Sequence, residues 1–325
     1  MIEKVVVIGF GNISKRHCAN LKLLYPSVKV YGMSSSGRFP STLPTNTDAV
    51  LTSFEEVILL NPNFVIVASP ATYHKEHAEK LIKSGIPVLL EKPISASLSD
   101  AKELVNCSKQ SGTITAVGYC LRYLTSSLKM KELLENHFLG RVYNFNINIG
   151  QYLPDWRPGK DYKNSVSASK SLGGGALREL SHDIDYAQWL LGPLNFEFGI
   201  LRTSQELELD VEDLVDVVFT TKLNVVCNLH MDFLQKQPSR KCTIIGEKGR
   251  LDWDLIKNTI QFYGADATEM VFNESEWDKN NMYIDMLIDF INKINFQENR
   301  CITVEEAHDV ISLIEDIEKS GMWII

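Results

Sequence analysis

The sequence predicts an α/β protein in two parts, a doubly wound parallel sheet followed by an α+β part with a mostly antiparallel sheet. Over residues 1–121, short continuous apolar segments alternate with helical patterns, as in parallel sheets that are buried on both faces. A Gly-x-Gly turn follows the first of these segments. After residue 122, longer alternating segments follow one another through hairpin turns, which is typical of an antiparallel sheet. We therefore expect one domain over residues 1–121 and a second over residues 122–325, with the alternative that a terminal helix at about 304–319 packs back on the first.

Composition limits the function classes. A chain of 325 residues is long enough for two domains, and 44% apolar with 23% charged residues is ordinary for a globular protein. The net charge of −8 argues against a nucleic-acid partner, because phosphate contacts need a basic surface. Six cysteines without Cys-x-x-Cys spacing predict reduced, buried thiols. The first strand begins too early to leave room for a signal peptide, and no apolar stretch is long enough to span a membrane, so we expect a cytoplasmic protein without a membrane partner.

The elements of the first part follow in order. We expect strands at residues 4–8, 28–33, 49–51, 64–68, 88–90 and 113–117, with helices at 12–25, 54–60, from 71 onward, and at 98–108. The third of these helices carries His74 and His77, whose spacing could hold a metal. No carboxylate or cysteine completes such a site, so we expect no metal, a solvated His77, and His74 near the edge of a cofactor.

The first turn has the pattern of a dinucleotide-binding loop. Gly9-Phe10-Gly11-Asn12-Ile13-Ser14 lies between a clear strand and a clear helix, which is the context that such a loop requires. The helix N-terminus would point its amides at a pyrophosphate. We therefore predict a Rossmann domain whose cofactor contacts include Gly9, Gly11, Asn12, Ile13 and Ser14.

The end of the second strand bears on the choice of cofactor. A carboxylate for the ribose hydroxyl is expected about 20 residues after the glycine loop, but this region holds Ser34, Ser35, Ser36 and Arg38. Hydroxyls and a guanidinium suit a 2′-phosphate better than a bare hydroxyl. The pattern favours NADP over NAD, with an ordinary surface loop as the alternative.

The strand at residues 88–90 ends in Glu91-Lys92-Pro93. Lys92 lies just past the carboxyl end of the strand, where open α/β sheets place their ligands. Proline restricts the preceding residue to extended conformations, so Lys92 is held in place. An ordinary polar turn is the alternative interpretation.

The second part begins with a helix at about 126–136. We then expect strands at 141–150, 196–202, 214–221, 224–233 and 242–245, and closing helices at about 276–294 and 304–319. Three glycines at 173–175 precede a predicted helix that runs to residue 191 and ends at a Gly-Pro pair. On such a helix one face would carry Arg178, Glu179, His182, Asp185 and Tyr186. The alternative is the solvated face of an amphipathic helix, whereas the long aromatic loop at 151–162 indicates function.

These motifs together resemble the glucose–fructose oxidoreductase / inositol dehydrogenase / rhizopine catabolism (Gfo/Idh/MocA) family over nearly the whole chain. The matching residues include Gly9 and Gly11, Arg16-His17, Ser69-Pro70 with His74, Glu91-Lys92-Pro93, Gly118 with Arg122, Trp156-Arg157, the three glycines, His182 and Asp185. The resemblance implies that Lys92 and His182 are catalytic and that the Lys92–Pro93 bond is often cis. It also implies cofactor contacts from Ser69, Pro70, His74, Glu91, Lys92, Trp156 and Arg157.

The chain departs from the family pattern at three positions. Arg178 stands where an aspartate is usual, four residues before the histidine, so Glu179 is the nearest acid and remains a catalytic candidate. Cys120 replaces a common asparagine, and no acid follows the second strand. The loop at 152–157 together with residues 179–182 is similar to a subgroup found with surface-sugar biosynthesis enzymes.

The predicted function is hydride transfer between a nicotinamide cofactor and a small carbohydrate or cyclitol. Alcohol oxidation needs a base, a role that His182 or Lys92 could fill. The predicted substrate contacts are Lys92, Arg122, Tyr162, Arg178, His182 and Asp185. Four cationic or phenolic anchors fit an acidic or phosphorylated sugar, namely Arg122, Arg157, Tyr162 and Arg178. Alternatives are NAD-dependent hydrolysis or elimination of a glycoside and a non-catalytic cofactor-binding sensor. We expect a homodimer or homotetramer through the second sheet, neither face of which is clearly polar in sequence.

Overall fold

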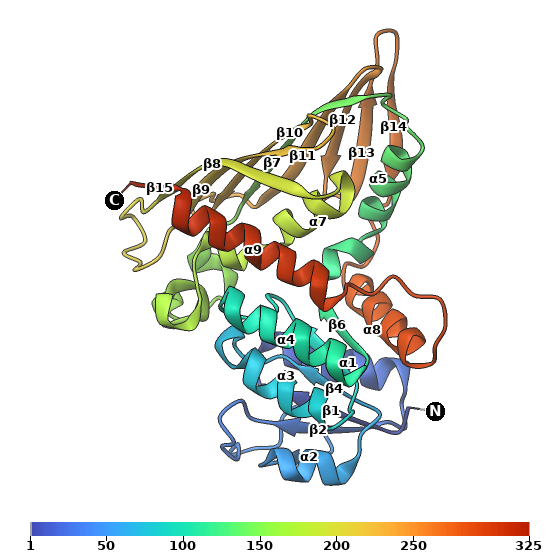
Figure 1. Ribbon diagram of the computed structural model, residues 1–325, viewed down its shortest axis with the longest axis vertical. Coiled ribbons are helices and arrows are strands. Elements are labelled where there is room, and N and C mark those ends of the chain that lie inside the picture. Colours follow the sequence, from blue (N-terminus) through green and yellow to red (C-terminus); the bar gives the residue numbers. More distant parts are fainter. Residues whose placement is uncertain (1, 325) are drawn as a thin grey trace. The chain divides into compact units, whose positions relative to one another are not determined.

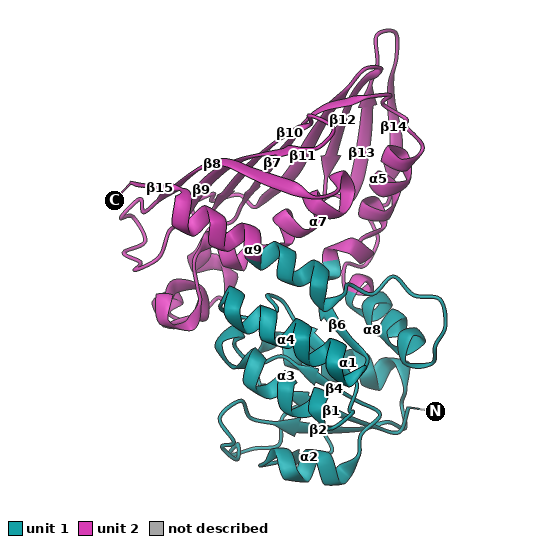
Figure 2. Cartoon of the chain, viewed as in Figure 1, with its two compact units in different colours: residues 1–120, 283–311 teal, residues 121–282, 312–325 magenta. Residues whose placement is uncertain are grey.

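The computed structural model describes residues 2–324, which form two compact units (Figure 2). The first unit contains the described residues up to 120 together with 283–311, and the second contains 121–282 together with the described residues from 312 onward. The chain thus leaves the first unit near the predicted boundary at residue 121 and returns to it over residues 283–311, whereas the sequence offered a return only as an alternative, for a helix at about 304–319. Helix α8 (Asn281–Ile294) lies largely in the first unit, and helix α9 (Val304–Ser320) has residues in both.

The first unit is built on a six-stranded parallel sheet of order β3-β2-β1-β4-β5-β6 (Figure 1). Its strands are β1 (Lys4–Ile8), β2 (Lys29–Met33), β3 (Ala49–Leu51), β4 (Phe64–Val67), β5 (Val88–Glu91) and β6 (Thr115–Gly118). Its helices include α1 (Asn12–Leu24), α2 (Phe54–Leu60), α3 (His74–Lys83) and α4 (Leu98–Ser111). The predicted doubly wound sheet is confirmed. Because the strand order reverses between β1 and β4, ligands are expected beyond the carboxyl ends of these strands.

The central strands of this sheet are almost completely buried, which explains their apolar sequences. Every residue of β4 and β5 is buried, and so is every residue of β1 after Lys4. Such continuous apolar runs suit a parallel sheet that is covered on both faces. Helices α2 and α4 begin at side-chain caps, since the Ser53 and Ser97 hydroxyls accept hydrogen bonds from the main-chain N–H groups of Glu56 and Asp100.

The second unit is built on a nine-stranded sheet of order β14-β13-β12-β11-β7-β10-β9-β8-β15. The sequence predicted β7 (Val142–Gly150), β8 (Leu194–Arg202), β9 (Leu214–Thr221), β10 (Val226–Asp232) and β11 (Ser239–Gly246). It missed β12 (Gly249–Asp254), β13 (Thr259–Tyr263), β14 (Thr268–Asn273) and β15 (Met322–Ile324). Among the described strands of this sheet, only the pairs β7–β10 and β8–β15 are parallel, which confirms a mostly antiparallel sheet.

The two faces of this sheet differ in burial. In β9, Val215, Val217 and Phe219 are buried, whereas Asp216 and Val218 are partly exposed. The buried face carries α5 (Thr125–Glu135) and α7 (His182–Leu191). Both helices contact Trp253 of β12, whose Nε1 donates to Ser126 Oγ at 2.9 Å and whose ring meets Tyr186 edge to face at 5.4 Å. The partly exposed positions of β9 are mixed, as the sequence indicated, and the neighbouring strands add Asn146, Asn228 and His230 to the same face.

Within residues 2–324, no helix combines the length and the apolar character needed to cross a bilayer. All six cysteines are free and buried, as their spacing predicted.

Candidate functional site

The glycine turn after β1 has the backbone that a dinucleotide loop needs. Gly9 has φ +114°, and a Cβ there would overlap the main-chain oxygen of Ala68. The Ser14 hydroxyl lies 3.5 Å from the same oxygen, so the third small residue also packs against the end of β4. Gly11 differs, because a Cβ on it would meet nothing within 4 Å. The space beside Gly11 is open, and a ligand can approach the main chain there.

The N-terminus of α1 completes this cradle. Gly11 is its N-cap and offers no side-chain hydrogen bond, and the first turn contains no acidic residue. The leading N–H groups of a helix have no intrahelical partner and carry a partial positive charge. The open space at Gly11 and these N–H groups fit the pyrophosphate of a dinucleotide, and contacts from Asn12 and Ile13 stay predictions.

A pocket of about 270 Å³ lies at the end of β2. Hydroxyl groups line much of it, contributed by Ser34, Ser35, Ser36, Thr52 and Ser53. Arg38 is exposed and is not among the lining residues. The lining carboxylate is Glu76, whose charge is paired with Lys80 at 2.8 Å. No acid of the β2 loop enters this pocket, as the sequence predicted.

His77 lies in the wall of this pocket. The sequence predicted a solvated side chain, but the structure shows His77 buried, stacked on Tyr73 at 5.6 Å and 3.0 Å from Ser69 Oγ through Nδ1. Burial lowers the pKa of His77 to about 4, so the ring is neutral near pH 7. It therefore contributes a hydrogen-bonding group and an aromatic surface rather than a charge.

Glu91 and Lys92 follow the carboxyl end of β5. Glu91 is buried, and its Oε1 lies 2.7 Å from Nε2 of His17, a fully buried residue of α1. The other carboxylate oxygen accepts from the main-chain N–H of Lys92 at 3.3 Å. Sequence reasoning gave His17 no role, although its place one turn after Ser14 puts it on the buried side of α1. The His17–Glu91 pair fixes the residue that precedes Lys92.

The Lys92–Pro93 peptide bond is cis, as the resemblance implied. The Pro93 carbonyl oxygen lies 2.8 Å from Nδ1 of His74, and Nε2 of the same ring lies 2.7 Å from the carbonyl oxygen of Ser69. Burial lowers the pKa of His74, and a neutral imidazole donates to only one of these two oxygens at a time. His74 therefore links the turn after β4 to the turn that carries Lys92.

In the second unit the predicted long helix is broken. The structure has α6 (Ala176–Glu179) and α7 (His182–Leu191), with Leu180 and Ser181 between them. The prediction of one continuous helix with a single polar face was wrong. Arg178 forms a two-bond ion pair with Glu318 of α9, each bond 2.7 Å long. Tyr186 is fully buried and donates to Asp183 Oδ1 at 2.7 Å, so the solvated-face alternative is also wrong for this position.

Arg122 and Asp185 pair inside the second unit. Arg122 Nε lies 2.9 Å from Asp185 Oδ2, and Nη2 lies 2.6 Å from Oδ1. Their side chains are 7% and 0% exposed. A buried two-bond pair of this kind anchors the start of α7 to the segment that follows β6. Their predicted role as substrate contacts stays a prediction, and their geometry favours positioning.

His182 and Glu179 are half-buried and so remain accessible. His182 is the first residue of α7, and Glu179 is the last residue of α6. The two residues therefore flank the break, and their catalytic roles stay predictions.

Two of the three glycines before α6 are required by packing. A Cβ on Gly174 would overlap the main-chain oxygen of Val166, and Gly175, with φ +110°, lies against the carboxylate of Glu212. That carboxylate accepts from the main-chain N–H of Leu177 at 3.0 Å and so caps α6. The turn therefore joins the loop before it to α6 through main-chain contacts.

Replacing Glu212 with glutamine should change how stability depends on pH. Burial raises the pKa of Glu212 from 4.5 to about 7, opposed by the Leu177 N–H bond and by Arg178 and reinforced by Glu318. Because the folded pKa lies above the unfolded one, the stability from the neutral carboxyl is complete below about pH 4.5 and is lost as pH rises to about 7. The loss reaches up to about 3 kcal/mol for a shift of this size. Urea unfolding at pH 5 and pH 8 should show that the free energy of unfolding falls less for Glu212→Gln than for wild type.

Glu269→Gln, at an exposed position of β14, is the matched control. Its free energy of unfolding should fall between pH 5 and pH 8 by as much as that of wild type. A Glu212→Gln protein that loses as much stability as wild type between the two pH values would refute the assignment.

A second pocket, of about 350 Å³, lies in the loop between β7 and α6. Short 3₁₀ turns shape this loop at Leu153–Trp156, Tyr162–Asn164, Val166–Ala168 and Lys170–Leu172. Trp156, Arg157 and Tyr162, which were predicted from sequence, all line the pocket. Lys160, Ser165 and Ser167 line it as well, and sequence reasoning gave them no role.

Comparison with known proteins gives the family. The family model described as "Oxidoreductase family, NAD-binding Rossmann fold" matches residues 3–119, and the "GFO/IDH/MocA C-terminal domain" model matches residues 127–252. Oxidoreductase P35 of Formosa agariphila is 30% identical over 200 residues, which cover 61% of this chain and 61% of that protein. Myo-inositol 2-dehydrogenase of Thermotoga maritima is 23% identical over 292 residues, which cover 86% of this chain and 81% of that protein. Across three curated relatives, the matched region spans between 55% and 61% of the relative's length.

Solved structures show the same fold. Levoglucosan dehydrogenase in complex with NADH superposes with a TM-score of 0.85 at 18% identity, covering 98% of this chain and 96% of that one. GenD2 from gentamicin A biosynthesis, in complex with NAD, superposes with a TM-score of 0.82 at 23% identity, covering 98% of this chain and 94% of that one. The glycine turn, the Glu91-Lys92-Pro93 segment and the two family matches agree, and the chain belongs to the GFO/IDH/MocA family of oxidoreductases, with an NAD-binding Rossmann fold in its amino-terminal part.

Proposed function

We propose that the protein transfers a hydride between a nicotinamide cofactor and a CH–OH carbon of a sugar, sugar derivative or cyclitol. One observation of the first unit carries the proposal: Lys92 follows the carboxyl end of β5, at the same sheet edge as the glycine turn after β1, with only β4 between them. An acid–base side chain thus shares a sheet edge with a cradle that fits a dinucleotide. Relatives named as dehydrogenases of myo-inositol and levoglucosan support this class of substrate.

The residues have distinct parts in the proposed reaction. Bound nicotinamide supplies the hydride acceptor or donor. Lys92 takes the hydroxyl proton when the alcohol is oxidised, and as an ammonium it polarises the carbonyl oxygen in the reverse direction. Glu91, held by His17, and Pro93, in contact with His74, fix the backbone on either side of Lys92. His182 and Glu179 are the second acid–base candidates.

The test is an incubation with NAD or NADP and a panel of C-deuterated sugars and cyclitols, followed by mass spectrometry of cofactor and sugar. Deuterium on the reduced cofactor, with one oxidised sugar per cofactor, supports hydride transfer. A changed sugar without net reduction of the cofactor would indicate hydrolysis or elimination instead. Cofactor binding without any change to a sugar would indicate a sensor, and both of these results would overturn the proposal.

For the cofactor, we propose that NADP binds at least as well as NAD. The β2-end pocket presents serine hydroxyls, and its carboxylate is already paired with a lysine. The sequence indicated Arg38 as a further partner of the 2′-phosphate, but Arg38 is exposed and does not line this pocket, so Arg38→Ala should leave the affinities for NADP and for NAD nearly unchanged. Titration of the apo-protein with both cofactors measures this. NAD binding tenfold tighter than NADP in wild type would contradict the proposal.

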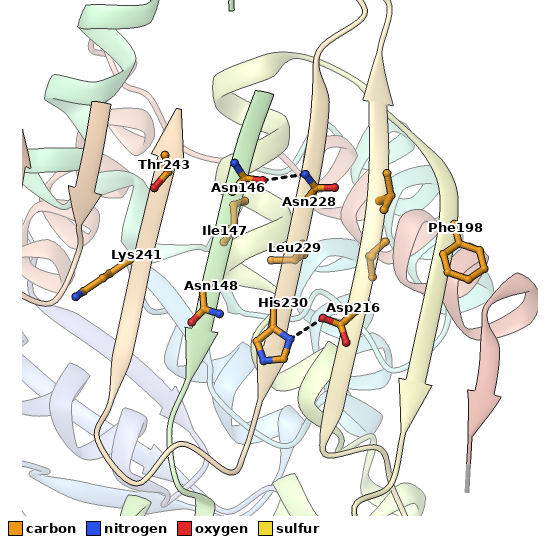
Figure 3. A pocket seen from close by; sticks show the side chains of 12 residues that line it. Asn146, Ile147, Asn148, Phe198, Asp216, Asn228, Leu229, His230, Lys241 and Thr243 are labelled. Atoms are coloured by element: carbon orange, nitrogen blue, oxygen red, sulfur yellow. Dashed lines mark hydrogen bonds and ion pairs between the residues drawn. The ribbon is translucent and has the colours of Figure 1, made fainter. Parts of the chain in front are cut away.

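For self-association, we propose a homodimer or homotetramer through the partly exposed face of the nine-stranded sheet (Figure 3). A hollow of about 450 Å³ lies on this face, beside the bond from Asn228 Nδ2 to Asn146 Oδ1 at 2.8 Å and the ion pair of His230 with Asp216 at 2.7 Å. Phe198, 48% exposed, adds apolar area. Light scattering at micromolar concentration should give at least twice the chain mass of 36.7 kDa, and a mass near 36.7 kDa would reject the proposal. A cytoplasmic location and a role in surface-sugar biosynthesis stay predictions.

A further inference from the structure

The loop pocket of the second unit is formed within one continuous stretch of chain. Residues 153–167 supply the lining side chains, and the volume of about 350 Å³ lies within the range of small-ligand pockets. Six of the lining residues carry its chemistry: Trp156, Arg157, Lys160, Tyr162, Ser165 and Ser167. None of them takes part in the acid–base chemistry proposed above.

Two aromatic rings form fixed walls. Trp156 donates through Nε1 to the Gln151 carbonyl at 3.3 Å, and its ring meets Phe233 edge to face at 5.2 Å. The Tyr162 hydroxyl donates to the Leu207 carbonyl at 3.3 Å. With their polar atoms engaged, both half-buried residues offer a ring face to a ligand. The negative face of an aromatic ring attracts the positively polarised C–H groups of a sugar ring.

Two cations in this pocket have no acidic partner. Among the residues that the structure describes, Arg157 and Lys160 are exposed and form no ion pair. The lining carboxylate, Asp161, instead accepts from the Lys163 main-chain N–H and from Asn164 Nδ2, both at 3.0 Å. The pocket therefore has two positively charged side chains and one carboxylate, which is already hydrogen-bonded to other groups. An arginine fork with a neighbouring ammonium suits a carboxylate or phosphate.

Two serines supply unused hydrogen-bonding groups. The hydroxyls of Ser165 and Ser167 are buried, and neither has a hydrogen-bond partner within residues 2–324. Ser167 as a whole is 1% exposed. A buried hydroxyl without a partner costs about 1–3 kcal/mol, a cost that an oxygen atom of a ligand removes.

From these contacts we infer that the loop pocket binds a sugar unit that carries a carboxylate or a phosphate. The sugar ring stacks on Trp156 and Tyr162, its anionic group pairs with Arg157 and Lys160, and its hydroxyls or the anion receive hydrogen bonds from the serines. The inference rests on the proposed function, whose substrate it narrows to acidic or phosphorylated carbohydrates. The sequence had assigned this anion to Arg122 and Arg178 as well, but their charges are paired with Asp185 and Glu318.

The test is calorimetric titration of the full chain, without cofactor, with glucuronate, glucose 6-phosphate and glucose as probes. We expect one of the anionic sugars to bind at least about tenfold tighter than glucose, and the stronger of the two identifies the anion. The double variant Arg157→Gln/Lys160→Gln should lose that tenfold difference, and Trp156→Ala should weaken all three probes. Lys163→Gln is the matched control, because the Lys163 ammonium is already paired with Glu208 and the change should leave binding of the anionic sugars unaltered.

Several results would overturn the inference. They are equal binding of glucose and the anionic sugars by wild type, an effect of Lys163→Gln as large as that of the double variant, or unchanged binding of the anionic sugars by a double variant that unfolds at the wild-type temperature. A double variant that loses cofactor affinity while keeping anionic-sugar affinity would assign the pocket to the cofactor, as the resemblance implied for Trp156 and Arg157. The deuterium-transfer assay is separate: transfer without anionic-sugar binding in this pocket refutes only the inference. Binding here without any transfer refutes only the proposed function.

Discussion

Replacing Lys92 with alanine is expected to lower kcat by at least ~100-fold, the usual contribution of a positioned acid–base group. Cofactor affinity should stay nearly unchanged. In the proposed binding mode, main-chain groups of the glycine turn and of the N-terminus of α1 hold the pyrophosphate, and these belong to other elements than the turn after β5. Steady-state kinetics on a sugar from the deuterium panel, together with cofactor titration, measure the two quantities separately.

Lys102→Ala provides the control, since Lys102 is an exposed lysine on α4 of the same unit. Its kcat should equal that of wild type. A Lys92→Ala protein that keeps more than about a tenth of wild-type kcat would remove Lys92 from the acid–base role.

Replacing Asp185 with alanine is expected to lower the free energy of unfolding by about 3–5 kcal/mol, because it leaves the buried Arg122 guanidinium without its carboxylate. Arg122 is only 6% exposed, so water cannot replace the lost partner without a rearrangement of the start of α7. Urea unfolding followed by circular dichroism gives the free energy directly.

The double variant Arg122→Met/Asp185→Leu should recover much of the loss, because apolar side chains of similar size need no charge partner. Glu132→Ala is the surface control. Its partner Lys129 lies 2.8 Å away, Glu132 is 57% exposed, and such pairs are worth ~1 kcal/mol or less. An Asp185→Ala protein that loses no more stability than Glu132→Ala would show that the pair does not hold α7.

The parallel sheet could be predicted because the residues of each central strand indicate a strand by themselves. Phe64–Val67 reads as a strand without reference to any other segment, since all four residues are apolar and buried. The strands β12 to β14 carry alternating or mixed patterns with charged residues such as Arg250, Asp252 and Glu269. Their partners are set by sheet pairing rather than by local propensity, so the sequence around them does not distinguish them from surface loops.

The same distinction holds for the candidate site. Gly9 and the Glu91-Lys92-Pro93 segment could be located because their backbone requirements are local. The break between α6 and α7 could not, because the groups that fix its two sides, Glu212 and Arg122, are distant in sequence. The ion pair of Arg178 could not be predicted for the same reason, since its partner Glu318 lies 140 residues further along the chain.

The glycine turn at 173–175 has a consequence for how this protein can diverge. Gly174 accommodates the main-chain oxygen of Val166, and the N–H of Gly175 donates to the carbonyl of Ser167 at 3.0 Å. Neither contact involves a side chain of the loop. A loop of quite different sequence can therefore be grafted onto the same turn, provided that its backbone returns along the same path. Mutation or recombination can therefore change the residues that line the loop pocket. Helix α6, its Glu212 cap and the helix that begins at His182 would keep their positions.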